Sequence, residues 1–124
     1  MSWGRFKKNP VNKFGADLAM GKSKLERAVD DLYVLREKAG EIKDLKRQVT
    51  LVLQDGPREQ RITWRVDFGY VECATEQQCY GEAKGFVDRE YKLKLKLFRA
   101  RPLGKLEIWQ GTYRNPKLVE VINP

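Results

Sequence analysis

Two acidic residues and a lysine stand in this sequence at a spacing that suits phosphodiester hydrolysis. Glu82 and Lys84 flank a single alanine in the segment GEAKG, and Asp67 lies earlier, in the segment VDF. Alternate residues of a β-strand point to the same face, so an extended GEAKG places Glu82 and Lys84 together. A hairpin with its turn near 75–77 would bring Asp67 beside them. We therefore expect two carboxylates and an amine to form one patch at a sheet edge.

Such a patch suits Mg²⁺ or Mn²⁺, because these ions prefer oxygen ligands and bind through one or two carboxylates, phosphate oxygens and water. A bound ion would lower the pKa of a water molecule and neutralise charge on the phosphate. Lys84 would orient or deprotonate that water, or stabilise the pentavalent phosphate. The chain has no histidine, which excludes nucleophile–histidine pairs and histidine-ligated zinc. By itself, however, a pair such as Glu82 and Lys84 is more often an ordinary solvated charge pair.

Periodicity and capping signals predict the elements that must position these residues. Helices are expected at 23–40 and 88–101, and strands at 47–54, 60–72, 79–85 and 105–110. The order α-β-β-β-α-β predicts an α/β (α+β) fold in which helices flank a four-stranded mixed sheet. The last strand follows a helix and should therefore lie parallel to the third.

The two helices differ in how clearly the sequence marks them. Ser23 and Glu26 form an S-x-x-E capping box, and Gly40 stands where a C-terminal glycine belongs. Between them, an apolar stripe follows the helical period and is made of Leu25, Ala28, Val29, Leu32, Leu35 and Ala39. The second segment alternates leucine and lysine as a strand would, but Asp88 at its start and Pro102 at its end favour a helix.

Composition limits the class of protein. The 124 residues suit one domain, and the net charge of +8 favours a polyanionic partner such as DNA. No apolar run is long enough to cross a membrane, and the N-terminus lacks the apolar core of a secretory signal. Two cysteines can build neither a disulfide framework nor a four-ligand zinc site, which indicates a reducing cytoplasm.

The order of the candidate residues resembles the PD-(D/E)XK nuclease superfamily, whose active site consists of an acid, a spacer and (D/E)-x-K. Asp67, Glu82 and Lys84 match this order, and Val66 stands where the name of the motif has proline. Residues 21–110 also resemble a small phage nuclease-like family, through an opening helix, a G-x-I turn and the segments VDF, GEAKGF and YKLKLKLF. The same core is similar to that of phage junction-resolving endonucleases and transposon end-cleaving enzymes.

This resemblance implies a restriction-endonuclease-like core and a metal-dependent DNA endonuclease of phage recombination, replication or packaging, acting in the host cytoplasm. It implies that Glu26 joins Asp67 and Glu82 as a metal ligand, and that Gln48 supports the site. Glu26 has the alternative role of a helix cap, and Gln48 that of an ordinary polar residue at a strand start. Branched DNA of the Holliday-junction type is the favoured substrate, because no base-reading element is evident. Symmetric cutting of two strands would require a homodimer.

Under this interpretation the chain has a basic arm at 1–22, a nuclease-like domain at 23–110 and a tail at 111–124. Basic side chains of the arm and the helices are expected to contact DNA phosphates: Lys7, Lys8, Lys13, Lys22, Lys24, Lys92, Lys96 and Arg99. The last three share one side of the second helix, where no acid is expected to neutralise them. Two alternatives stay open: a non-catalytic nucleic-acid-binding module with this fold, and a structural or scaffold phage protein with ordinary surface charge.

Overall fold

A computed structural model describes residues 23–124, which form an α+β fold with two α-helices and one five-stranded mixed sheet. The elements in chain order are α2 (Lys24–Lys38), β2 (Ile42–Gln54), the 3₁₀ turn η1 (Arg58–Gln60), β3 (Ile62–Glu72), β4 (Gln77–Ala83), α3 (Arg89–Ala100), β5 (Lys105–Thr112) and β6 (Asn115–Ile122). The strand order is β2-β3-β4-β5-β6. Only β4 and β5, which α3 connects, run parallel, so the predicted parallel pairing is confirmed.

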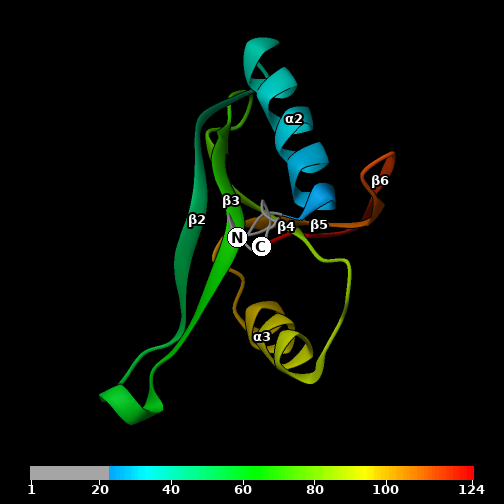
Figure 1. The fold of residues 1–124 in the computed structure, drawn as a ribbon. Helices are drawn as coiled ribbons and strands as arrows, with labels where there is room; N and C mark the ends of the chain where they lie inside the picture. The colour runs from blue at the N-terminus through cyan, green and yellow to red at the C-terminus, as the bar shows by residue number, and fades with distance from the viewer. Residues whose placement is uncertain (1–22) are drawn as a thin grey trace, which may run out of the picture.

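The sheet has one strand more than the sequence predicted. The prediction of four strands, with a tail at 111–124, is wrong because β6 pairs antiparallel with β5 from Thr112↔Asn115 to Leu106↔Ile122. β5 and β6 form a hairpin, so β6 covers the edge of β5 and becomes the edge strand of the sheet (Figure 1, orange and red). β6 also carries Glu120, which neutralises Arg99 of α3.

Both helices begin at the side chains that the sequence marks as caps. Ser23 Oγ accepts the N–H of Glu26 at 3.0 Å, and Asp88 Oδ1 accepts the N–H of Tyr91 at 2.8 Å. The segment that alternates leucine and lysine is therefore helical, as predicted. The apolar stripe of α2 is shifted from the prediction: Leu35 is 61% exposed, and Tyr33 is fully buried instead.

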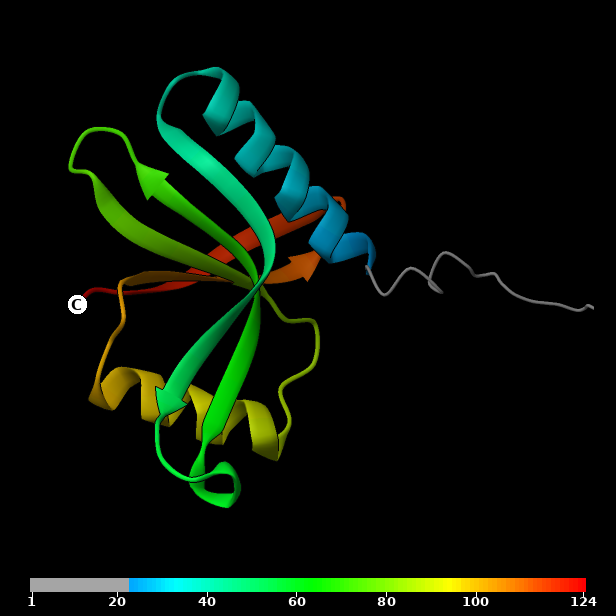
Figure 2. The ribbon, with the colours of Figure 1, turned by 90° about the vertical axis from the view of Figure 1, so that its left-hand side faces the viewer.

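The helices lie on opposite sides of the β4–β5–β6 part of the sheet, and the long β2–β3 hairpin flanks both of them (Figure 1). Figure 2 shows this hairpin running from the end of α2 to a point beyond α3. Buried side chains accordingly form two core clusters, one that includes Val29 and Tyr33 of α2 and one that includes Phe98 of α3. Leu106 of β5 packs in the α3 cluster. Within residues 23–124, neither helix has the length and apolar character needed to cross a membrane.

Candidate active site

The candidate acids lie where strands β3 and β4 separate. Pairing between these strands runs from Glu72↔Gln77 to Phe68↔Gly81 and then stops. Beyond that point β3 remains paired with β2 and continues toward η1, whereas β4 remains paired with β5 (Figure 2). Asp67 and Glu82 are the next residues on the two strands, so their side chains occupy the base of the fork.

Each carboxylate at the fork replaces a hydrogen bond that the separating strands no longer make. The backbone N–H of Asp67 donates to Glu82 Oε1 at 3.1 Å, and the N–H of Ala83 donates to Asp67 Oδ2 at 2.9 Å. Since these backbone groups belong to rigid strands, both carboxylates are held in place by the sheet itself. The predicted convergence of these two acids is thus present in the geometry.

Gln48 connects the acid pair to the first helix. Its side-chain amide donates to Glu26 Oε2 at 3.2 Å and also hydrogen-bonds the carboxylate of Asp67. Gln48 has φ +56°, a left-handed conformation that is rare for a non-glycine residue and is often retained at functional sites. A regular strand would project this side chain differently, so the irregular backbone and the bridge between Glu26 and Asp67 belong together.

Burial raises the pKa of both fork carboxyls. Glu82 is 6% exposed, and its desolvation, with the nearby charge of Asp67, raises its pKa to about 9. Burial also raises the pKa of Asp67, although hydrogen bonds from Ala83, Glu82 and Gln48 oppose the increase. The positive charge of Lys84 lowers both pKa values. Near neutral pH the two carboxyls therefore share a proton, and further positive charge is needed to ionise both.

Lys84 follows directly after β4 and extends the sheet register by donating its N–H to the carbonyl of Trp109 at 2.9 Å. Its Nζ lies 5.4 Å from the ring centroid of Tyr91 on α3, within the range of a cation–π contact. The hydroxyl of Tyr91 is buried and has no hydrogen-bond partner among residues 23–124. Lys84 is thus half-buried beside the acids, with an aromatic ring limiting its movement.

The donor set fits a divalent cation that takes few protein ligands. Asp67 and Glu82 present adjacent carboxylates, which is enough for Mg²⁺ because this ion keeps several waters and shares substrate phosphate oxygens. Residues 23–124 contain no cluster of three or more side chains of the metal-binding types. Glu26 reaches the pair through Gln48, so Asp67 and Glu82 are the direct ligands that the geometry favours.

The predicted DNA-contacting residues have different surroundings. Lys92 and Lys96 are exposed on α3, and Lys24 is exposed with its Nζ 5.3 Å from the ring centroid of Tyr113. Arg99 is not the unneutralised charge that the sequence suggested, because its guanidinium binds Glu120 of β6 at 2.6 Å. The remaining four lysines of the prediction, Lys7, Lys8, Lys13 and Lys22, lie outside the described residues, as does the predicted basic arm.

A buried polar network, which the sequence did not reveal, fixes α2 to the sheet. Oε1 of Glu107 on β5 accepts hydrogen bonds from the hydroxyls of Tyr33 (2.8 Å) and Tyr70 (2.6 Å) and from Arg36 (3.0 Å). Gly81 makes room for the Tyr33 side chain of this network, since a Cβ on residue 81 would collide with the Tyr33 hydroxyl. The first glycine of GEAKG therefore serves the packing of α2. The helical spacing of Tyr33 from Leu25 and Val29 was the available signal.

Replacing Gln48 by glycine tests the role of its side-chain amide while keeping the positive-φ backbone conformation. Glycine adopts positive φ freely, so Gln48→Gly should change the free energy of unfolding by less than about 1 kcal/mol. It removes the amide between Glu26 and Asp67, and loss of such supporting contacts typically reduces metal affinity or activity by about 10- to 100-fold. Metal titration and urea unfolding would measure the two effects.

Glu76→Gly is the matched control, because Glu76 also has positive φ (+58°) but lies in the β3–β4 turn. It should leave metal affinity and activity unchanged. Equal losses in both variants would show that the effect of Gln48→Gly arises from the backbone and not from the amide bridge.

The chain matches no protein-family model, and no curated protein or solved structure is significantly similar to it. Its function must therefore be inferred from its own residues.

Proposed function

We propose that this chain is a metal-dependent DNA endonuclease with a restriction-endonuclease-like core of the PD-(D/E)XK type. The observation that carries the proposal is the fork of β3 and β4, where Asp67 and Glu82 are held side by side by backbone N–H groups. Lys84, two residues beyond Glu82, adds the amine of the motif. An ordinary surface charge pair does not require a buried acid, Glu82, to lie against a half-buried one, Asp67, because removing carboxylates from water costs free energy.

The acid pair would hold Mg²⁺ or Mn²⁺, with Glu26 acting through Gln48. The ion would supply positive charge to the scissile phosphate and acidify water at neutral pH. The backbone N–H groups of Asp67 and Ala83 keep the two carboxylates oriented before any ion arrives. Lys84 would orient the attacking water or stabilise negative charge on the phosphate.

Binding of DNA would depend mainly on phosphate contacts. The chain carries a net charge of +8, and Lys92 and Lys96 are exposed on α3, the helix whose Tyr91 ring meets Lys84. Binding by such contacts releases counterions, so affinity should fall steeply as the salt concentration rises. A homodimer would allow both strands of a symmetric junction to be cut.

Branched DNA is the proposed substrate, and the exposed Phe86 supports it. Phe86 follows Lys84 by two residues and is 75% exposed, which is unusual for a phenylalanine. Unpaired bases stack on exposed aromatic rings, whereas bases within a continuous duplex are already stacked. The position of Phe86 thus favours DNA with unpaired or splayed bases near the cut.

Phe86→Ala should therefore weaken binding of a junction or splayed DNA about tenfold, as expected for loss of one stacking contact, and leave binding of a continuous duplex unchanged. Fluorescence anisotropy in EDTA would measure both affinities. Val119→Ala is the control, because Val119 is also exposed but lies on β6. A uniform loss for both kinds of DNA would contradict the preference for unpaired bases.

The proposed activity is tested by incubating the protein with supercoiled, linear and four-way-junction DNA in Mg²⁺, Mn²⁺ or EDTA. We expect cutting in either metal, none in EDTA, and a preference for the junction. If DNA is bound tightly in a salt-dependent manner and cut in neither metal, the chain is instead a non-catalytic nucleic-acid-binding module. If it neither binds nor cuts DNA, both interpretations are wrong.

A further inference from the structure

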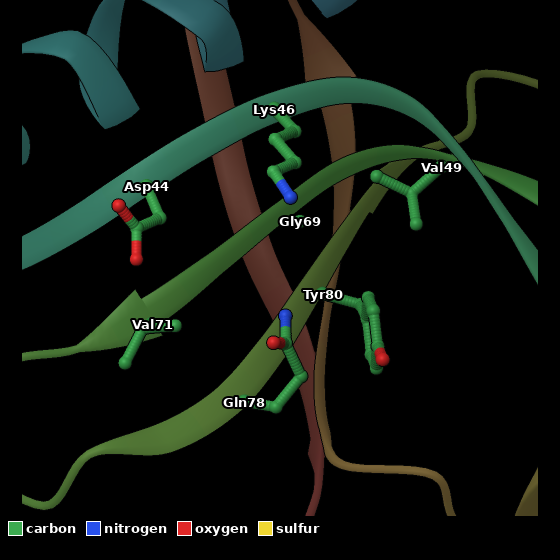
Figure 3. Close-up of a pocket in the computed structure, with 7 residues that line it drawn as sticks. All are labelled: Asp44, Lys46, Val49, Gly69, Val71, Gln78 and Tyr80. Carbon is green, nitrogen blue, oxygen red and sulfur yellow. The ribbon is translucent and has the colours of Figure 1, made fainter.

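A groove of about 190 Å³ is lined by Gly69 and Tyr80, which by strand alternation face the same side of the sheet as Asp67 and Glu82. Figure 3 shows it over β2, β3 and β4, with Lys46, Gln78 and Tyr80 around it and Gly69 at its base. Gly69 and Tyr80 are directly opposite each other in the β3–β4 register. Each is two residues from a fork acid, so the groove begins about 7 Å along the strands from the acid pair, at ~3.4 Å per residue.

The backbone creates this groove in two ways. Gly69 has no side chain, and a Cβ there would lie 2.9 Å from Val49 Cγ2 and 3.7 Å from Tyr80 Cδ1. The pairing of β2 with β3 shifts register between Lys43 and Lys46, and Asp44 in this irregular stretch has φ +56°. The irregularity places the side chains of Asp44 and Lys46 at the rim of the groove (Figure 3). The hollow is thus built into the sheet and does not depend on a loop.

The polar groups around the groove retain unused hydrogen-bonding capacity. Lys46 is exposed, and among residues 23–124 no acid forms an ion pair with its ammonium group. The amide nitrogen of Gln78 donates to the carbonyls of Tyr70 and Cys79 at 3.0 and 3.2 Å, which leaves its oxygen as an acceptor. Tyr80 is half-buried and lines the groove with its ring. The groove therefore offers one cation, Lys46, and one aromatic surface, Tyr80. Its two acceptors are the Gln78 oxygen and the carboxylate of Asp44.

We propose that this groove binds one nucleotide of the DNA strand, next to the phosphate that the acid pair holds. Its base contacts the ring of Tyr80, Lys46 contacts a phosphate, and Asp44 and the Gln78 oxygen accept hydrogen bonds from the base edge. This inference rests on the proposed nuclease function, because the acid pair fixes where the strand lies. Gly69 leaves room for a base because it has no side chain. The groove lies about two strand residues from the acid pair, which suits one nucleotide beside the cut.

Binding is measured in EDTA by fluorescence anisotropy with a labelled splayed-arm DNA, so that no metal or turnover is needed. Lys46→Ala should weaken binding about fivefold to tenfold and lower the slope of log affinity against log salt by about one. Lys117→Ala removes the same charge from an exposed position on β6 and should have a much smaller effect. Lys46 and Lys117 variants that bind equally well would overturn the assignment of a phosphate to the groove.

Abasic nucleotides, introduced one position at a time, test the contact with the base. At one position the loss of the base should weaken binding to the wild type about tenfold and to Tyr80→Leu hardly at all, whereas Tyr80→Phe should behave as the wild type. The absence of any position with this coupling would overturn the base contact.

These results separate the groove from the nuclease activity. If the wild type cuts DNA and the Lys46 and Tyr80 variants cut with an unchanged KM, the groove assignment fails while the nuclease proposal stands. If the variants lose affinity as described but the wild type never cuts, the groove stands as a nucleotide site and the nuclease proposal fails.

Discussion

Glu82→Gln is expected to reduce metal-dependent DNA cleavage on the order of 10³-fold while leaving the fold intact. The amide has nearly the same shape as the carboxylate, and its oxygen can still accept the N–H of Asp67 that Glu82 Oε1 accepts now. It cannot become an anion, so the fork loses one of its two candidate ligands. Cleavage rates in Mg²⁺ and Mn²⁺, together with metal affinity from calorimetry, would measure the loss.

The stability of this variant should change little, and urea unfolding would measure the change. Glu82 is 6% exposed and its pKa is raised to about 9, so the protein already holds it in a neutral form near pH 7. A neutral amide should therefore cost less than about 1 kcal/mol of unfolding free energy. Glu76→Gln is the matched control, because Glu76 is exposed and its ion pair within residues 23–124 is with Lys43 on the surface. A Glu82→Gln protein that cuts DNA at the wild-type rate would remove the basis of the nuclease proposal.

The acid pair could be predicted from the sequence because its placement depends on local rules. Strand period places Glu82 and Lys84 on one face, and a short turn between two strands brings Asp67 beside Glu82. What strand period does not reveal is the fork. Whether β3 and β4 separate at Asp67 depends on β4 pairing with β5, which is a long-range choice. The left-handed backbone of Gln48 is equally invisible, since glutamine has no preference for it.

The error at the C-terminus had a consequence for the predicted surface charge. Gly111 and Pro116 follow the strand predicted at 105–110, and both residue types usually signal a loop. The segment nevertheless forms β6, where an edge strand tolerates proline. A prediction without β6 places no acid beside Arg99, whereas in the structure Glu120 of β6 binds its guanidinium. A prediction that omits a strand thus also omits the ion pairs that the side chains of that strand form.

Glu107→Ala is expected to destabilise the protein by about 3–5 kcal/mol, the range for breaking a buried charge network. Three donors converge on Glu107 Oε1, from Tyr33, Tyr70 and Arg36, and Glu107 is 5% exposed. Burial and the charge of Glu107 raise the pKa of Tyr33 and Tyr70 above its usual range, so both hydroxyls stay protonated as donors. Without the carboxylate, these donors would be buried without an acceptor. Urea unfolding would measure the difference.

Glu107→Gln separates the network from the chemistry of the site. The amide oxygen can still accept from the tyrosines, so the loss should be about 1–2 kcal/mol. Glu107 lies on the α2 side of β5, whereas its neighbours Leu106 and Ile108 pack on the α3 side. The polar partners of its side chain among residues 23–124 are Tyr33, Tyr70 and Arg36, and not the acid pair. At temperatures where the variant is folded, its cleavage rate should therefore equal that of the wild type. Glu82→Gln should show the reverse, with stability kept and cleavage lost. A similar loss of cleavage in both variants would mean that the buried network, and not only the fork, sets the geometry of the acids.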